Sequence, residues 1–108
     1  MDNHFPALDK SKYCRLLAKN LPTLRQQANI SQEELCTRLG FSRQSLSNYE
    51  TGRKEMGWTC FAAIVLFFYM YDNTRSIMET MGIVDEDIGF VLDLNKKLNI
   101  PTFLRVKG

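Results

Sequence analysis

Four polar side chains in one short segment stand out for the chemistry they can perform: Arg43, Gln44, Ser47 and Asn48. Their spacing puts them on one face of a helix, because residues three and four apart are neighbours on a helical surface. All four carry hydrogen-bond donors and none is a carboxylate, whereas an ordinary solvated face is rich in Glu and Lys. Arg, Gln and Asn are the side chains that bond bidentately to guanine or adenine edges in the major groove. We therefore predict that this face contacts the bases of double-stranded DNA.

The segment that must position these side chains is NISQEELCTRLGFSRQSLSNYETGRK, residues 29–54. It predicts two short helices, with Ser31 and Ser42 as their N-terminal caps. Glu34 follows Ser31 by three residues, which is the capping-box arrangement. Gly40 and Gly52 suit the left-handed residues that end the two helices. A helix, a glycine-containing turn and a second helix form the DNA-binding helix-turn-helix motif.

The longer run Leu21–Met56, LPTLRQQANISQEELCTRLGFSRQSLSNYETGRKEM, resembles the lambda-repressor-like, or XRE-type, helix-turn-helix regulators of phages and bacteria. The SQEEL run, the glycine turn and the SRQSLSNYETG run are each in the family's register. The resemblance implies an all-α, compact bundle of about five helices. It implies base contacts by Arg43, Gln44, Ser47 and Asn48, phosphate contacts by Gln32, Ser42, Arg53 and Lys54, and an internal ion pair between Arg25 and Glu50.

Pro22 departs from the family pattern, because it lies where a continuous first helix is usual. Proline lacks a backbone donor and clashes with the preceding turn, so it is tolerated only near a helix start. We therefore predict a front helix from about Asp9 to Lys19, added to the family core. A short second helix should follow, capped by Asn20 or Leu21.

The composition fits one domain of 108 residues with an uneven charge distribution. Residues 10–54 hold nine Lys or Arg against three acidic residues, whereas residues 55–108 hold five bases against seven acids. A basic half is expected where one face meets phosphates. Cys14, Cys36 and Cys60 are an odd number without CxxC spacing, which favours reduced thiols over disulfides.

The sequence contains few residues that could form a catalytic or metal-binding motif. His4 is the only histidine, so neither a zinc site nor a Ser–His–Asp or Cys–His arrangement is expected. No glycine-rich phosphate loop or nucleotide fingerprint occurs. We expect no enzyme activity, no cofactor and no metal.

The run Trp58–Tyr71, WTCFAAIVLFFYMY, is uncharged and apolar nearly all round. Its fourteen residues fall short of the roughly 20 that cross a bilayer. We therefore predict a core helix and no membrane contact. Because such a helix must be covered on every side, the C-terminal third or a second copy should supply part of the cover.

The C-terminal third predicts a helix from Asn73 or Thr74 to Met81, ended by Gly82, and another from Asp85 to Asn99. The second helix carries an apolar stripe that fits an intramolecular core and a dimer seam equally well. The stripe consists of Ile88, Val91, Leu92 and Leu98, widened by Phe90 and Leu94. For a dimer, the candidate centre is Phe68, Met78, Phe90 and Leu94.

These patterns predict three parts: a mobile N-terminus (1–8), a helix-turn-helix core with the added helix (9–72), and a C-terminal helical extension that could mediate dimerisation (73–108). The function they favour is a sequence-specific transcriptional regulator of a bacterium or phage, cytoplasmic and nucleoid-associated. We expect a homodimer on DNA and repression by promoter occlusion. Two alternatives remain: an antitoxin that holds a toxin or effector protein through its C-terminal third, and a protein-interaction module on the same fold.

Overall fold

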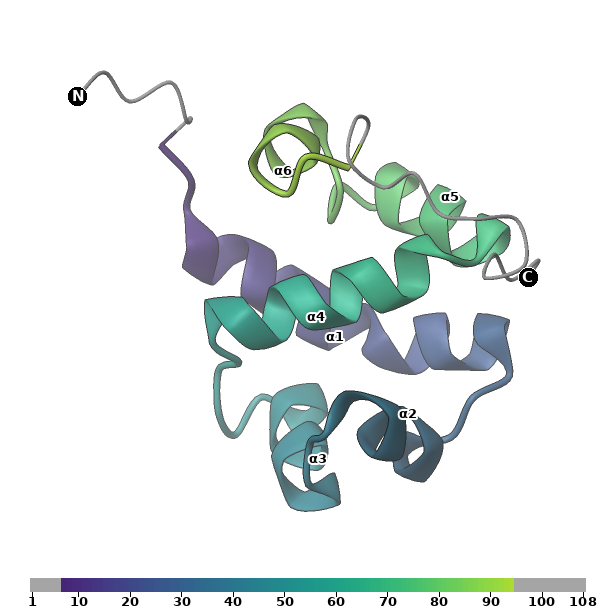
Figure 1. Ribbon diagram of the computed structural model, residues 1–108. Helices are drawn as coiled ribbons and strands as arrows, with labels where there is room; N and C mark the ends of the chain where they lie inside the picture. Colours follow the sequence, from purple (N-terminus) through teal and green to yellow (C-terminus); the bar gives the residue numbers. More distant parts are fainter. Residues whose placement is uncertain (1–6, 95–108) are drawn as a thin grey trace.

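Six helices make up the part of the chain that the structure describes, residues 7–94 of a computed structural model (Figure 1). They are α1 (Lys10–Ala28), α2 (Gln32–Leu39), α3 (Arg43–Thr51), α4 (Trp58–Tyr69), α5 (Asp72–Thr80) and α6 (Glu86–Val91). The predicted all-α class, the helix-turn-helix and the C-terminal helical extension are confirmed.

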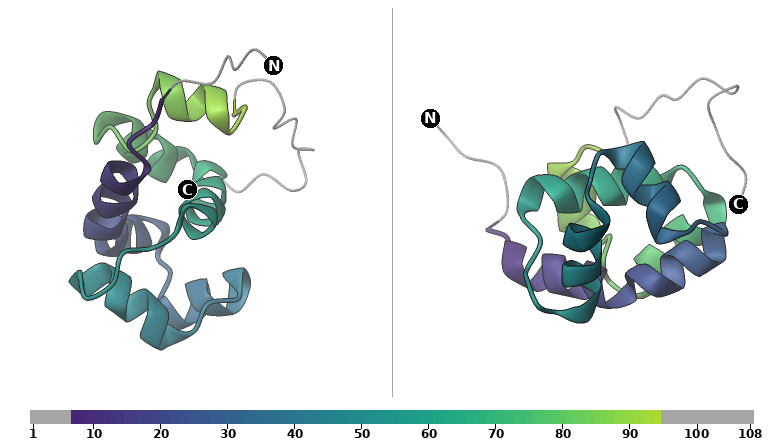
Figure 2. Two further views of the ribbon diagram at one scale, coloured as in Figure 1. Left: turned by 90° about the vertical axis from the view of Figure 1, so that its left-hand side faces the viewer. Right: turned by 90° about the horizontal axis from the view of Figure 1, so that it is seen from below.

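The helices are arranged at three levels. In Figures 1 and 2, α1 and α4 lie side by side in the middle, α2 and α3 lie below them, and α5 and α6 lie above. The long helix α1 contacts α3, α4 and α5, so it joins the lower and upper levels. Helix α1 therefore provides the surface against which the helix-turn-helix packs, through α3.

One continuous apolar core fills the space between these levels. It is built from fully buried side chains of every helix and of the α5–α6 connection, including Leu17, Leu21, Leu24, Leu35, Leu46, Phe61, Ile64, Phe68, Met78, Ile83 and Ile88. Helix α4 is the core helix that its sequence predicts, packed against α1 and α5. Within residues 7–94, no helix is both long and apolar enough to cross a membrane.

The predicted break at Pro22 is wrong, because α1 runs without interruption from Lys10 to Ala28. A proline inside a helix costs about 3 kcal/mol. The same stretch buries Leu17, Leu21 and Leu24 completely, and each such side chain contributes about 1.5–3 kcal/mol. Core packing on both sides of Pro22 therefore outweighs the proline penalty, and the predicted front helix is the first part of α1.

Two predictions about the C-terminal third need correction. Helix α5 begins at Asp72 after Tyr71, so neither Asn73 nor Thr74 is its cap; the buried Thr74 hydroxyl instead donates to the Phe68 carbonyl at 2.6 Å. Helix α6 ends at Val91 because Asp93 adopts a left-handed conformation with φ 56°. The amide of Leu94 then donates to the Gly89 carbonyl at 2.9 Å, which closes the helix end. The predicted continuation to Asn99, with Leu98, lies outside the described residues.

Part of the C-terminal apolar stripe belongs to the core of the monomer. Ile88 is fully buried and Leu94 is 4% exposed. Of the proposed dimer centre, Phe68 and Met78 are also fully buried, so these side chains cannot form a seam without unfolding. Phe90 is 51% exposed. The structure therefore places Ile88 and Leu94 of this stripe in the intramolecular core and Phe90 on the surface.

Candidate DNA-binding surface

Local sequence signals position the two helices of the helix-turn-helix. The Ser31 hydroxyl accepts from the Glu34 amide and the Ser42 hydroxyl accepts from the Ser45 amide, both at 3.0 Å. Gly40 ends α2 with φ 82°, and Gly52 ends α3 with φ 79°. These are the caps that the sequence predicts.

The capping box at the start of α2 is only half formed. The Ser31 side chain caps as expected, but the Glu34 carboxylate pairs with Arg38 Nη2 at 3.1 Å one turn further along. The cap therefore depends on the serine, and Glu34 contributes an exposed i,i+4 ion pair instead.

The outer face of α3 holds the four predicted base-contacting side chains together. Arg43 and Gln44 are exposed, while Ser47 and Asn48 are partly buried. Gln44 Nε2 donates to Asn48 Oδ1 at 3.2 Å, which couples the two side-chain amides one helical turn apart. This bond leaves the Gln44 carbonyl and the Asn48 amino group available to a partner. Arg43 makes no ion pair with any other described residue.

The inner face of α3 is fixed by packing and by a neutral thiol. Leu46 is fully buried, and the buried Cys36 thiol of α2 donates to the Ser42 carbonyl at 3.5 Å. Burial raises the pKa of Cys36, although the nearby Arg43 acts in the opposite direction. Cys36 therefore remains a protonated packing residue beneath the turn.

A network of three side chains ties α3 to α1 and α2. Arg25 Nε and Nη2 bond to the two Glu50 carboxylate oxygens at 2.8 and 3.0 Å. Gln32 Nε2 adds a third bond to Glu50 Oε1 at 2.9 Å. The Glu50 side chain is only 7% exposed and that of Arg25 18%. The ion pair implied by the family resemblance is thus present, and it fixes the position of α3 relative to α1 and α2.

Gln32, which the resemblance implies as a phosphate contact, has an additional partner that sequence reasoning missed. Its amide nitrogen is engaged with Glu50, eighteen residues away. No local pattern in the sequence signals this bond. A phosphate near the start of α2 would meet the backbone amides of its first turn together with this already oriented side chain.

The loop after α3 presents the other two predicted phosphate contacts. Arg53 and Lys54 are exposed, and both their backbone amides donate to the Asn48 carbonyl, at 2.9 and 3.2 Å. These bonds close the end of α3 and hold Arg53 and Lys54 next to its last turn. The remaining predicted phosphate contact, Ser42, lies at the opposite end of α3, where its hydroxyl also bonds to that of Ser45 at 2.9 Å.

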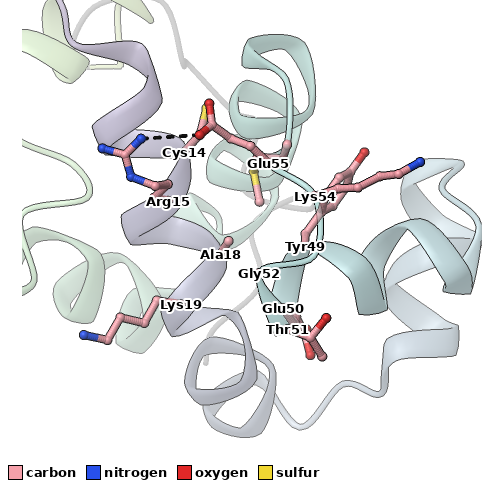
Figure 3. Close-up of a pocket in the computed structure, with 11 residues that line it drawn as sticks. Cys14, Arg15, Ala18, Lys19, Tyr49, Glu50, Thr51, Gly52, Lys54 and Glu55 are labelled. Carbon is pink, nitrogen blue, oxygen red and sulfur yellow. Dashed lines mark hydrogen bonds and ion pairs between the residues drawn. The ribbon is translucent and has the colours of Figure 1, made fainter.

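The end of the same loop is anchored to α1, which the sequence did not indicate. Glu55 accepts a hydrogen bond from the Ser11 hydroxyl, and its other oxygen lies 3.4 Å from Arg15 Nη1 (Figure 3). Arg15 also bonds to Ser11 at 2.8 Å. The front turns of α1 therefore restrain the loop that carries Arg53 and Lys54.

The cysteines do not form a reactive or metal-binding centre within the described residues. Cys14 and Cys36 are buried, Cys60 is partly buried, and all three are free thiols. Burial, with a smaller contribution from Cys14, raises the pKa of Cys60 to about 11. No group of His, Cys, Asp or Glu that could hold a metal ion occurs in residues 7–94. His4 lies outside that range.

Comparison with known families agrees with this geometry. Residues 16–66 match a family model described as a helix-turn-helix domain. Those residues run from the middle of α1 through α2 and α3 into α4. Comparisons with curated proteins and with solved structures found no match. Residues 16–66 of this chain are therefore a helix-turn-helix domain, in agreement with the lambda-repressor-like, XRE-type resemblance of its sequence.

Proposed function

We propose that this protein is a transcriptional regulator that binds a specific site in double-stranded DNA through α3. The observation that carries the proposal is the outer face of that helix. It presents Arg43, the coupled amides of Gln44 and Asn48, and Ser47, with no carboxylate among them. A base edge offers donors and acceptors in a fixed pattern, and rigidly held amide and guanidinium groups are the groups that match it.

Phosphate contacts at the two ends of α3 would fix its register on the duplex. Ser42 lies at one end, Arg53 and Lys54 follow the other, and Gln32 at the start of α2 is bonded to Glu50 in the last turn of α3. Such contacts supply affinity without sequence information, whereas the helix face between them supplies the discrimination. The Arg25–Glu50 pair contributes indirectly by holding α3 at a defined angle.

The working form that we propose is a homodimer on DNA. One recognition helix reads only a few base pairs, so two copies are needed for a selective site, with half-sites about 34 Å apart. We infer repression by blocking a promoter, because occupation of a DNA site is by itself enough to exclude another protein from it. The burial of Met78, Ile88 and Leu94 inside the monomer lowers the support for the antitoxin alternative, because it removes these side chains from any toxin-binding surface.

Selection of bound duplexes from random DNA by the purified full chain tests the proposal. Enrichment of a two-fold repeat with half-site centres about 10 base pairs apart is the expected result. Recovery of no sequence preference from a folded protein would show that the helix-turn-helix serves another purpose, such as protein binding.

A further inference from the structure

A cavity of about 380 Å³ lies behind the proposed DNA-binding surface, between α1 and the end of α3 (Figure 3). Its walls come from residues 14–19 of α1, the last turn of α3 and the loop up to Met56. Sites for small molecules usually enclose about 300–1,000 Å³, so the size is adequate for one compact ligand. We propose that this cavity binds a small aromatic anion, and that binding of the anion weakens the contact with DNA.

The floor of the cavity suits a flat apolar group. Cys14, Ala18 and Met56 are buried residues that line it, and the partly buried Tyr49 adds an aromatic ring. Burial raises the pKa of the Cys14 thiol, so this floor is uncharged at neutral pH. Aromatic rings and polarizable sulfur pack favourably against one another. An aromatic ligand would therefore gain more from this floor than an aliphatic one of the same size.

The carboxylates around the cavity already have partners. Glu50 is bonded to Arg25 and Gln32, and Glu55 is bonded to Ser11 and Arg15. Figure 3 shows the Arg15–Glu55 contact at one end of the cavity. These acids have little capacity left for a cationic ligand.

Two lysines that line the cavity have no acidic partner among the described residues. Lys19 on α1 and Lys54 on the loop are both exposed, and neither makes an ion pair within residues 7–94. In Figure 3 their side chains extend outward in opposite directions. Lysine has a flexible stem with four rotatable bonds, so each ammonium can turn back over an occupied cavity. The uncompensated charge is positive, which selects a ligand with an acidic group.

The cavity depends on a part of α1 that precedes the helix-turn-helix match. Cys14 and Arg15 lie before residue 16, where the match begins. Arg15 and Ser11 hold Glu55, which keeps the loop over the cavity. The front turns of α1 therefore supply one wall and restrain another.

Weaker DNA binding on ligand binding follows from the position of Lys54, and this step rests on the proposed function. Lys54 is one of the phosphate contacts that we propose, and an acidic ligand would compete for its ammonium. Loss of one phosphate contact weakens binding to all sequences and lowers the salt dependence by about one unit. By linkage, DNA should reduce the affinity for the ligand by the same factor.

The binding step is tested without DNA by titrating the full chain with 8-anilinonaphthalene-1-sulfonate and recording amide chemical shifts by NMR. We expect saturable 1:1 binding with shifts concentrated in residues 14–19 and 49–56. The uncharged N-phenyl-1-naphthylamine should bind about tenfold more weakly, because it lacks the sulfonate. Shifts centred elsewhere, or equal affinity for the two probes, would overturn the inference.

Matched lysine variants identify the charges involved. Lys19→Gln should weaken binding of the sulfonate probe about three- to tenfold. Lys12→Gln changes another exposed lysine of α1 that does not line the cavity, so it should leave the affinity unchanged. Equal effects of the two substitutions would contradict the assigned position of the ligand.

The regulatory step is measured with the DNA site that selection identifies. The sulfonate probe should weaken binding of the wild-type protein to that site about three- to tenfold, and it should have less effect on Lys19→Gln. Unchanged DNA affinity at saturating probe would refute the regulation while leaving the cavity site intact. A protein that binds the probe but no DNA would instead refute the proposed function.

Discussion

The Arg25–Glu50 pair predicts that Glu50→Ala will be one of the most destabilising changes on the lower half of the molecule. Glu50 accepts three hydrogen bonds from Arg25 and Gln32, and its side chain is 7% exposed. Removing one partner of a buried pair leaves the other charge stranded, at a cost of about 3–5 kcal/mol. Because Arg25 is 18% exposed and can regain some hydration, we expect about 2–4 kcal/mol here.

Urea or thermal unfolding followed by circular dichroism measures this cost. For a chain of this size, the expected loss corresponds to a fall in Tm of roughly 10–20 °C. Glu34→Ala is the matched control, because its ion pair with Arg38 joins side chains that are 46% and 51% exposed. An exposed i,i+4 pair contributes only about 0.3–0.5 kcal/mol. A double substitution of Arg25 and Glu50 should cost less than the sum of the single ones. Similar losses for Glu50→Ala and Glu34→Ala would refute the reasoning.

Two further predictions concern the connection to α6 and the helix ends. The Tyr13 hydroxyl donates to Asp85, and this bond, followed by burial, raises the pKa of Tyr13 to about 12. Because the pKa of Tyr13 is higher in the folded state, its contribution to stability is complete below pH 10 and is lost as the pH rises towards 12. Over that range the free energy of unfolding of wild type should fall by about 2 kcal/mol relative to that of Tyr13→Phe. Parallel pH profiles of the two proteins would contradict this. Gly52→Ala should cost about 1 kcal/mol, because φ is +79° there and a Cβ is strained although the space is open. Unchanged stability of Gly52→Ala in denaturant titrations would show that the left-handed backbone carries no such cost.

The helix-turn-helix could be predicted from the sequence because its signals are local. Ser31, Gly40, Ser42 and Gly52 each specify a helix end within a few residues, and the structure has all four in those roles. The side chains on the outer face of α3 follow directly from those ends. For this segment, local preference and tertiary packing agree.

The structure differs from the sequence predictions where tertiary packing opposes a local signal or where the local signal is weak. Pro22 predicted a break, but the leucines around it bury enough surface to keep α1 continuous. Asp93 ended α6 early in a left-handed conformation, which Asp adopts far less often than Gly. The contact of Glu55 with Arg15 joins residues forty positions apart, and nothing in the local sequence of either residue predicts it.

The most direct test of the central claim compares Arg43→Ala and Lys54→Ala with wild type on the selected DNA site and on random duplex, over a range of salt concentrations. If α3 reads bases, Arg43→Ala should weaken binding to the selected site by about 1–3 kcal/mol and relax the preference at one or two positions. Lys54→Ala should weaken binding to both duplexes alike and lower the salt slope by about one unit. Equal weakening of selected and random DNA by Arg43→Ala would contradict the account, because Arg43 would then be a phosphate contact.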